Sequence, residues 1–207
     1  RAVATQAFRT LPNHQHLLKR LPRVTRVALE VISDREAARL VCLGALSGRP
    51  PGHRTLVVDV AEETTSLILA DGEQPLALWR LAVGTGCLMP RAGATGGRDR
   101  LRAASWKRQL QQALALAHLH AARGAAGEAV LIRPRELNPA TASGGGAAAS
   151  GGGKVAYLVA ITFVEEIASY LHIRRVQATE AGLHDGILRE LSRGLGQGPL
   201  TPGVAVG

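Results

Sequence analysis

Aromatic residues and cysteines are scarce in this sequence of 207 residues, which contains two Trp, two Tyr, two Phe and two Cys. Because the chain lacks the stacked aromatic platforms that many single-strand binders use, we expect any nucleic-acid contact to be made mainly to the phosphate backbone. Cys42 and Cys87 lie far apart in the sequence. Their spacing is not that of a metal or redox motif, and a disulfide scaffold is excluded.

Long apolar runs are also missing. The longest extends from Val155 to Val164 and ends at two glutamates. This run is much shorter than the roughly 20 residues that a membrane-spanning helix needs, so no membrane partner is expected. With 46% hydrophobic residues, the chain still has ample material for a core, which excludes wholesale disorder.

Acidic residues are outnumbered by basic ones. The chain has 25 Lys and Arg against 16 Asp and Glu, a formal net charge of +9, and only three of the basic residues are lysines. A GC-rich genome explains such an arginine excess, and so does contact with phosphate, because the guanidinium fork matches phosphate oxygens. The segment from 91 to 108 is interpreted either as a solvated helix face or as a set of polyanion contacts. The candidate contacts are Arg91, Arg98, Arg100, Arg102, Lys107 and Arg108.

Strand-like and helix-like patterns alternate along the chain. We expect strands at 2–8, 27–32, 55–60, 65–70, 76–83, 128–132 and 174–178. We expect helices at 14–21, 35–46, 99–120, 154–172 and 183–193. The strands between 55 and 83 follow one another closely, and Asp71-Gly72 is typical of a hairpin. The sequence therefore predicts the α/β class, with a mixed sheet flanked by helices.

Glycine and proline divide the chain into segments. The sequence GRPPG at 48–52 is interpreted as a domain hinge. Residues 142–153 read ASGGGAAASGGG, a composition typical of a flexible linker. The tail at 194–207 is expected to be loose or extended.

Four segments resemble, in order, strings of one known family. They are AVATQAFRTLPN at 2–13, EVISDREAARLVCLGALSG at 30–48, TLVVDVAEETTSLILADG at 55–72 and TEAGLHDGILREL at 179–191. These are similar to motifs of the exopolyphosphatase/guanosine-pentaphosphatase (Ppx/GppA) phosphatase family. The resemblance implies an actin-like ATPase fold with two ribonuclease-H-like domains and a cleft between them. It assigns 1–50 to the end of an incomplete first domain and 53–193 to the second domain.

Active members of the family resemble Mg²⁺-dependent hydrolases of polyphosphate or guanosine pentaphosphate, and this chain departs from their phosphate-binding string. Where the family has D-I-G-G-G-S-T-E, residues 59–66 read DVAEETTS. The glycines that let a backbone approach phosphate closely are gone. A glutamate 4 Å from a phosphate charge costs about 4 kcal/mol at an effective dielectric constant near 20. The remnant of this loop is Ala61, Glu62, Glu63 and Thr64.

The carboxylate that activates water in the family is also replaced. Its position in the string before A-R-L is Ala37. Glu36 stands one residue earlier and is therefore turned about 100° around the helix. Glu36 and Arg9, which matches the family's cleft arginine, remain as weak catalytic candidates. Arg9 is otherwise expected to pair with Glu36 or Asp34.

Two further positions of the family pattern survive. Asp59 matches the aspartate linked to Mg²⁺, or alternatively caps a turn at the end of its strand. His184-Asp185 stand where the family has Arg-Glu, and Asp185 is expected to cap or pair within its own helix. No cofactor is expected, and Mg²⁺ only if the protein is active.

The combined interpretation is a pseudoenzyme that acts as a structural or interaction subunit. The arginine excess, linker and tail favour protein partners in a large ribonucleoprotein, with contacts to the RNA backbone. The first residue is Arg1, as removal of a targeting peptide would leave, so a mitochondrial ribosome or its assembly intermediate is one expected setting, and the cytoplasm the other. The alternatives are an active phosphohydrolase, with Asp59 holding Mg²⁺ and Glu36 as base, and a non-catalytic polyanion-binding sensor.

Overall fold

The computed structural model describes residues 2–5, 8–9, 12–61, 63–84, 97–119, 124–132 and 149–195, with backbone only for 97–104, 149–159 and 195. Its strands are β1 (Ala2–Ala4), β2 (Leu29–Val31), β3 (Arg54–Val60), β4 (Thr65–Asp71), β5 (Gln74–Leu81), β6 (Glu128–Ile132) and β7 (Arg175–Thr179). Its helices are α1 (His14–Thr25), α2 (Asp34–Ala45), α3 (Gly97–Leu116), α4 (Ala149–Tyr170) and α5 (Leu183–Leu195).

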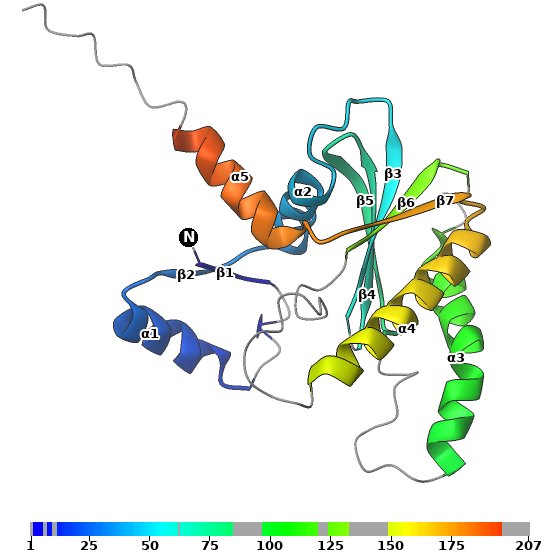
Figure 1. The fold of residues 1–207 in the computed structure, drawn as a ribbon. Coiled ribbons are helices and arrows are strands. Elements are labelled where there is room, and N and C mark those ends of the chain that lie inside the picture. The colour runs from blue at the N-terminus through cyan, green and yellow to red at the C-terminus, as the bar shows by residue number, and fades with distance from the viewer. Residues whose placement is uncertain are drawn as a thin grey trace, which may run out of the picture.

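The larger sheet has five strands in the order β5-β4-β3-β6-β7. Strands β3, β4 and β5 form the expected antiparallel meander, while β6 pairs parallel to β3 and β7 parallel to β6. Figure 1 shows α3 and α4 on one face of this sheet, and α2 and α5 on the other. Both faces are covered, which explains why the central strand β3 has a nearly continuous apolar sequence.

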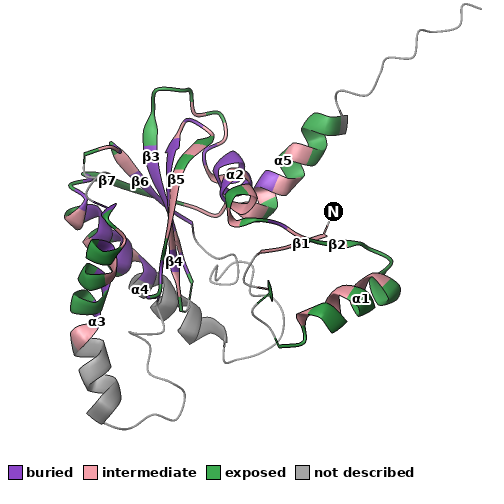
Figure 2. Ribbon diagram, turned by 180° about the vertical axis from the view of Figure 1, so that it is seen from behind, coloured by how far each residue is buried: buried purple, intermediate pink, exposed green. Residues whose placement is uncertain are grey.

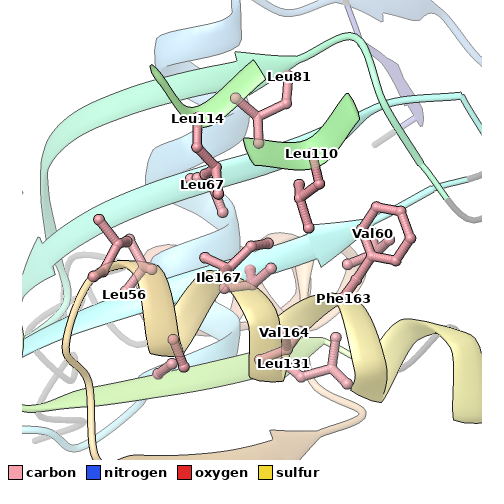
Figure 3. Close-up of a cluster of buried hydrophobic side chains, with 14 of the residues drawn as sticks. Leu56, Val60, Leu67, Leu81, Leu110, Leu114, Leu131, Phe163, Val164 and Ile167 are labelled. Atoms are coloured by element: carbon pink, nitrogen blue, oxygen red, sulfur yellow. The ribbon is translucent and has the colours of Figure 1, made fainter. Parts of the chain in front are cut away.

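One hydrophobic core lies between the sheet and helices α3 and α4. Alternate residues of β3, Leu56, Val58 and Val60, point into it. Phe163 of α4 is fully buried and stacks on Trp106 of α3, with ring centroids 5.2 Å apart. Figure 3 shows leucines of β3, β4, β5 and α3 gathered around Ile167 of α4 in this core. The apolar faces of α3 and α4 therefore cover this side of the sheet.

A second core lies on the opposite face and is built with α2. Ala38, Val41 and Cys42 of α2 pack with Val57 of β3 and Val130 of β6. Helix α5 runs along α2 and adds Leu183. The division into domains at 50–53 stays a prediction. The packing adds that α2, which precedes the expected hinge, shares a core with the sheet that follows it.

The amino-terminal unit is small and open. β1 and β2 pair in parallel as a two-stranded sheet, and α1 connects them. No residue of α1 is buried. In Figure 2 this helix is coloured as exposed and intermediate only, in contrast to β3, β4 and β6, which are mainly buried. Two-stranded sheets are at best marginally stable alone, so this unit depends on its neighbours.

Several expected boundaries differ from the structure. The first strand ends at Ala4, because the chain enters a short turn at Phe8 and Arg9. Helix α1 continues through Pro22 to Thr25, because the fixed φ of proline is helical and the Arg26 N–H closes the end on the Pro22 carbonyl at 2.9 Å. The remaining elements lie within a few residues of their expected ranges.

The predicted linker is too long at its carboxyl end. Helix α4 begins at Ala149, so 149–153 belong to a helix and not to the linker. Residues 151–153 are glycines, which disfavour a helix, but adding residues to the end of an existing helix costs less than nucleating a new one. Residues 142–148 lie outside the described part of the chain. Among the described residues, no helix has both the length and the apolar character needed to cross a membrane.

Candidate functional site

Three polar side chains line up across the larger sheet where β3 ends. Asp59 of β3 is opposite Ser66 of β4, which is opposite Arg80 of β5. Directly opposed residues share one face of a sheet, and Asp59 alternates with Val58 and Val60. The row therefore lies on the face covered by α2. Arg80 reaches the first turn of α2, where its Nη2 donates to Asp34 Oδ1 at 3.1 Å.

The electrostatic state of Asp59 follows from this position. Burial raises the pKa of its carboxyl above the usual value, because the charged form loses its hydration, and the positive charge of Arg80 partly opposes this rise. The Asp59 carboxyl thus lies near an arginine that is already bound to Asp34. Arg80 of β5 thus interacts electrostatically with Asp59 of β3 and with Asp34 of α2. The sequence pattern alone did not indicate that Arg80 belongs to this group.

In the turn between β3 and β4, the first backbone N–H is already bonded within the protein. The Ala61 N–H donates to the Thr64 carbonyl at 2.9 Å, which closes a tight turn between β3 and β4. A phosphate loop instead directs consecutive backbone N–H groups at the ligand. Glu63 is exposed at this turn, and Glu62 lies outside the described residues. In the loop remnant, the Ala61 N–H is therefore already hydrogen-bonded within the turn, and the Glu63 side chain is exposed.

The first turn of α2 places the other candidate residues. Ser33 is the N-cap, and its Oγ accepts the Glu36 N–H at 3.2 Å. Ala37 offers only a methyl group at the position of the family's carboxylate. Glu36 binds Arg39 of the next turn through both of its oxygens, each at 2.8 Å. A carboxylate held in a bidentate pair is poorly suited to act as a base.

Arg39 connects this pair to a second helix, α5. It also binds Glu190 of α5, and the two carboxylates, with Glu36 the larger influence, raise its pKa. Arg9 is exposed in the short turn that follows β1. The two carboxylates expected to pair with Arg9 have other partners. Glu36 binds Arg39 in the next turn of α2, and Asp34 binds Arg80 of β5.

Helix α5 contributes packing where the family pattern has polar residues. Asp185 Oδ2 accepts the Gly182 N–H at 3.0 Å, so Asp185 caps its own helix as expected. A Cβ on Gly44 of α2 would lie 2.1 Å from the Gly182 carbonyl oxygen. A Cβ on Gly186 would likewise clash with the backbone of Leu40, so Gly44 and Gly186 allow the α2 and α5 backbones to touch. Sequence reasoning gave these two glycines no role, because they lie too far apart in the chain for any local spacing to reveal the contact.

The described residues around Asp59 do not fit a Mg²⁺ ion. Magnesium requires several oxygen ligands in octahedral geometry. The described residues contain no group of three His, Cys, Asp or Glu that could hold a metal. The charged group acting on the Asp59 carboxyl is the Arg80 cation, which repels a metal. No chemical step can be derived through Mg²⁺ at this position.

The basic segment near α3 is described only in part. Arg91 lies outside the described residues, as do the side chains of Arg98, Arg100 and Arg102. Lys107 Nζ lies 3.3 Å from Glu166 Oε2 and 5.5 Å from the centroid of the Trp106 ring. Its charge is therefore partly used within the fold, while Arg108 is exposed.

Comparison with known proteins decides the family. The model of the Ppx/GppA phosphatase family matches residues 1–132. The chain belongs to this family. Its match ends at the last residue of β6, so it includes Arg9, the whole of α2 and the β3–β4 turn.

Solved structures of the Ppx/GppA family share the fold. The Aquifex aeolicus PPX-GPPA enzyme superposes with a TM-score of 0.66 at 16% identity, covering 92% of this chain and 74% of that one. An exopolyphosphatase-like protein gives 0.65 at 20% identity, covering 93% and 77%. The exopolyphosphatase from Cytophaga hutchinsonii gives 0.64 at 15% identity, covering 93% and 74%. The mixed five-stranded sheet and its flanking helices thus form the ribonuclease-H-like unit of the actin-like ATPase fold, as expected from the sequence.

Proposed function

We propose that this chain is a non-hydrolysing member of the Ppx/GppA family that acts as an interaction subunit of a larger, RNA-containing assembly. The observation that carries the proposal is the pairing of carboxylates with arginines beside Ala37. Asp34 binds Arg80, and Glu36 binds Arg39. Asp34 thereby helps to hold α2 against β5, and Glu36 is paired with the arginine that also binds Glu190 of α5.

Phosphate hydrolysis needs a cradle for the anion, a metal and a group that activates water. Ala37 has no proton acceptor, Ala61 uses its N–H inside the turn, and Asp59 faces a cation. Each loss alone would impair catalysis, and together they affect all three requirements. This supports a fold that is retained for a purpose other than hydrolysis.

The fold around the lost site is nevertheless well packed. Two hydrophobic cores cover both faces of the larger sheet. The net charge of +9 favours an anionic partner, and the open amino-terminal unit offers surface for contact. A packed scaffold, a basic surface and an open unit together support a role in binding.

Two experiments test this proposal. The purified chain is incubated with inorganic polyphosphate and Mg²⁺, and released phosphate is measured; we expect no release above a protein-free control. Turnover that disappears in Asp59→Ala would establish the phosphohydrolase alternative. The native protein is also sedimented from its own cell lysate with and without ribonuclease. Migration in a heavy particle that ribonuclease disrupts is the expected result, and migration as a small protein in both lanes contradicts the proposal.

A further inference from the structure

Helix α1 carries a basic face. His16, Lys19, Arg20 and Arg23 follow the spacing i, i+3, i+4, i+7, which places them on one side of a helix. All four are exposed. We call these four residues the basic face of α1. Measured along the helix axis it spans about 10 Å, from the rise of 1.5 Å per residue.

The opposite side of α1 is apolar, and three of its leucines are partly covered while Val24 near its end is exposed. Leu17, Leu18 and Leu21 are half-buried, whereas Lys19, Arg20 and Arg23 are exposed. The apolar side fixes which way the helix is turned, so the basic side points to solvent. Packing of the helix against β2 therefore does not cover the charges.

The charges of the basic face are not used within the described part of the fold. Helix α1 contains no Asp or Glu. The ion pairs formed by described residues do not include Lys19, Arg20 or Arg23. Arg39, Arg49 and Arg80, by contrast, are each held by a carboxylate. Unpaired cations on one helical face keep their full attraction for an outside anion.

A hollow lies at the amino end of the same face. It has a volume of about 560 Å³, and it is lined by Pro12, Asn13, His14, Gln15, His16 and Lys19. His16 and Lys19 thus belong both to the hollow and to the basic face. The amino end of a helix carries a partial positive charge and free N–H groups. The hollow is therefore suited to an anionic group at the end of the row of cations.

We propose that the basic face of α1 binds the phosphate backbone of RNA, with one phosphate seated in the hollow at the end of the helix. The proposal deepens the proposed function, since it names the surface through which this chain contacts RNA. Phosphate contacts position a nucleic acid without reading its sequence. Helix α1 contains no Phe, Tyr or Trp to act as a stacking platform for bases. Binding is therefore independent of sequence and strongly dependent on salt.

The test uses the full chain and a labelled single-stranded RNA of mixed sequence, with binding followed by fluorescence anisotropy. The variant is Lys19→Gln/Arg20→Gln/Arg23→Gln, which removes three charges and keeps good helix formers. The matched control is Arg54→Gln/Arg174→Gln/Arg175→Gln, which removes three charges from exposed positions at one end of the larger sheet. Circular dichroism and thermal melting check that both variants fold like the parent.

We expect the α1 variant to bind at least about tenfold more weakly near 100 mM salt, with a salt slope smaller by about 2, because roughly 0.7 is lost per phosphate contact on a single strand. The control should retain the parent's affinity to within about twofold and its steeper salt slope. Arg20→Lys/Arg23→Lys keeps the charge and should keep binding.

Equal losses in both triple variants, or no loss in the α1 variant, overturn the proposal. The affinity for inorganic polyphosphate is measured in the same way. If it exceeds the affinity for RNA per phosphate and depends on the same three side chains, RNA is not the ligand.

The outcome separates this proposal from the proposed function. If the α1 variant still enters a ribonuclease-sensitive particle and still binds RNA, the surface is wrong and the interaction role stands. If the native chain enters no such particle although the purified chain binds RNA through α1, the surface stands and the assembly role fails.

Discussion

Gly186 of α5 lies against the backbone of Leu40 in α2, so close that a Cβ on Gly186 would be 1.8 Å from the Leu40 carbonyl oxygen. No real side chain fits at that distance. The contact joins α2, which precedes the expected hinge, to the helix that ends the described chain. It also holds Arg39 beside Glu190. The orientation of the candidate site therefore depends on a glycine with no chemistry of its own.

Gly186→Ala is expected to lower the free energy of unfolding by at least about 2 kcal/mol, because α2 and α5 must separate to admit the methyl group. Gly194→Ala, in the same helix, is the control, since nothing lies within 4 Å of its added Cβ. It should stabilise the chain slightly, because alanine is the better helix former. Urea unfolding monitored by circular dichroism measures both. Equal effects of the two substitutions would contradict the close packing.

Asp59→Asn is expected to stabilise the protein at neutral pH. The folded-state pKa of Asp59 is raised by burial, so the native chain binds this proton more tightly than the unfolded chain, and stability falls as pH rises through the raised pKa. At pH 7 the substitution should raise Tm by roughly 2–4 °C, the shift that about 1 kcal/mol produces in a chain of this size.

The gain from Asp59→Asn should shrink as the pH falls below the raised pKa, because Asp59 is then neutral in the parent as well. Asp71→Asn is the control. Asp71 accepts the Gly52 N–H at 2.5 Å, so its amide variant should give no gain. A lower Tm for Asp59→Asn at pH 7 would mean that the attraction of Arg80 outweighs burial.

Cys42 is expected to resist alkylation in the native protein. It is fully buried in the core that α2 shares with the larger sheet, and burial raises the pKa of its thiol to about 12. The reactive form is the thiolate. In a Cys87→Ser background, iodoacetamide at mildly alkaline pH should modify the chain only after unfolding in urea. Rapid labelling of the native chain would show that α2 separates readily from the sheet.

Ala37→Glu is expected to fold and to remain inactive. The position is half-buried near the start of α2, where an acidic side chain is favourable for the helix dipole. Restoring the carboxylate does not restore the phosphate cradle at 61–64. Phosphate release from polyphosphate should stay at the protein-free background, as for the control Ala37→Gln. Turnover by the glutamate variant alone would show that Ala37 is the single lesion.

The element types were predictable because they depend on local patterns. The run TLVVDV gives β3, Asp71-Gly72 gives the hairpin between β4 and β5, and Ser33 gives the start of α2. The family was predictable too, because four segments keep their order. The extension of α1 beyond Pro22 was not, since proline ends most helices and only the surrounding chain decides when one continues.

The sequence by itself determined the α/β class, the family and the replacements at Ala37 and 61–64, because these depend on residue identity and local order. Only the tertiary structure decided that Arg80 binds Asp34, that Arg39 also binds Glu190, and that α2 packs on the larger sheet. Those partners come from segments far apart in the chain. Their pairing is set by how closely two backbones approach, as Gly44 and Gly186 show, and no local periodicity carries that information.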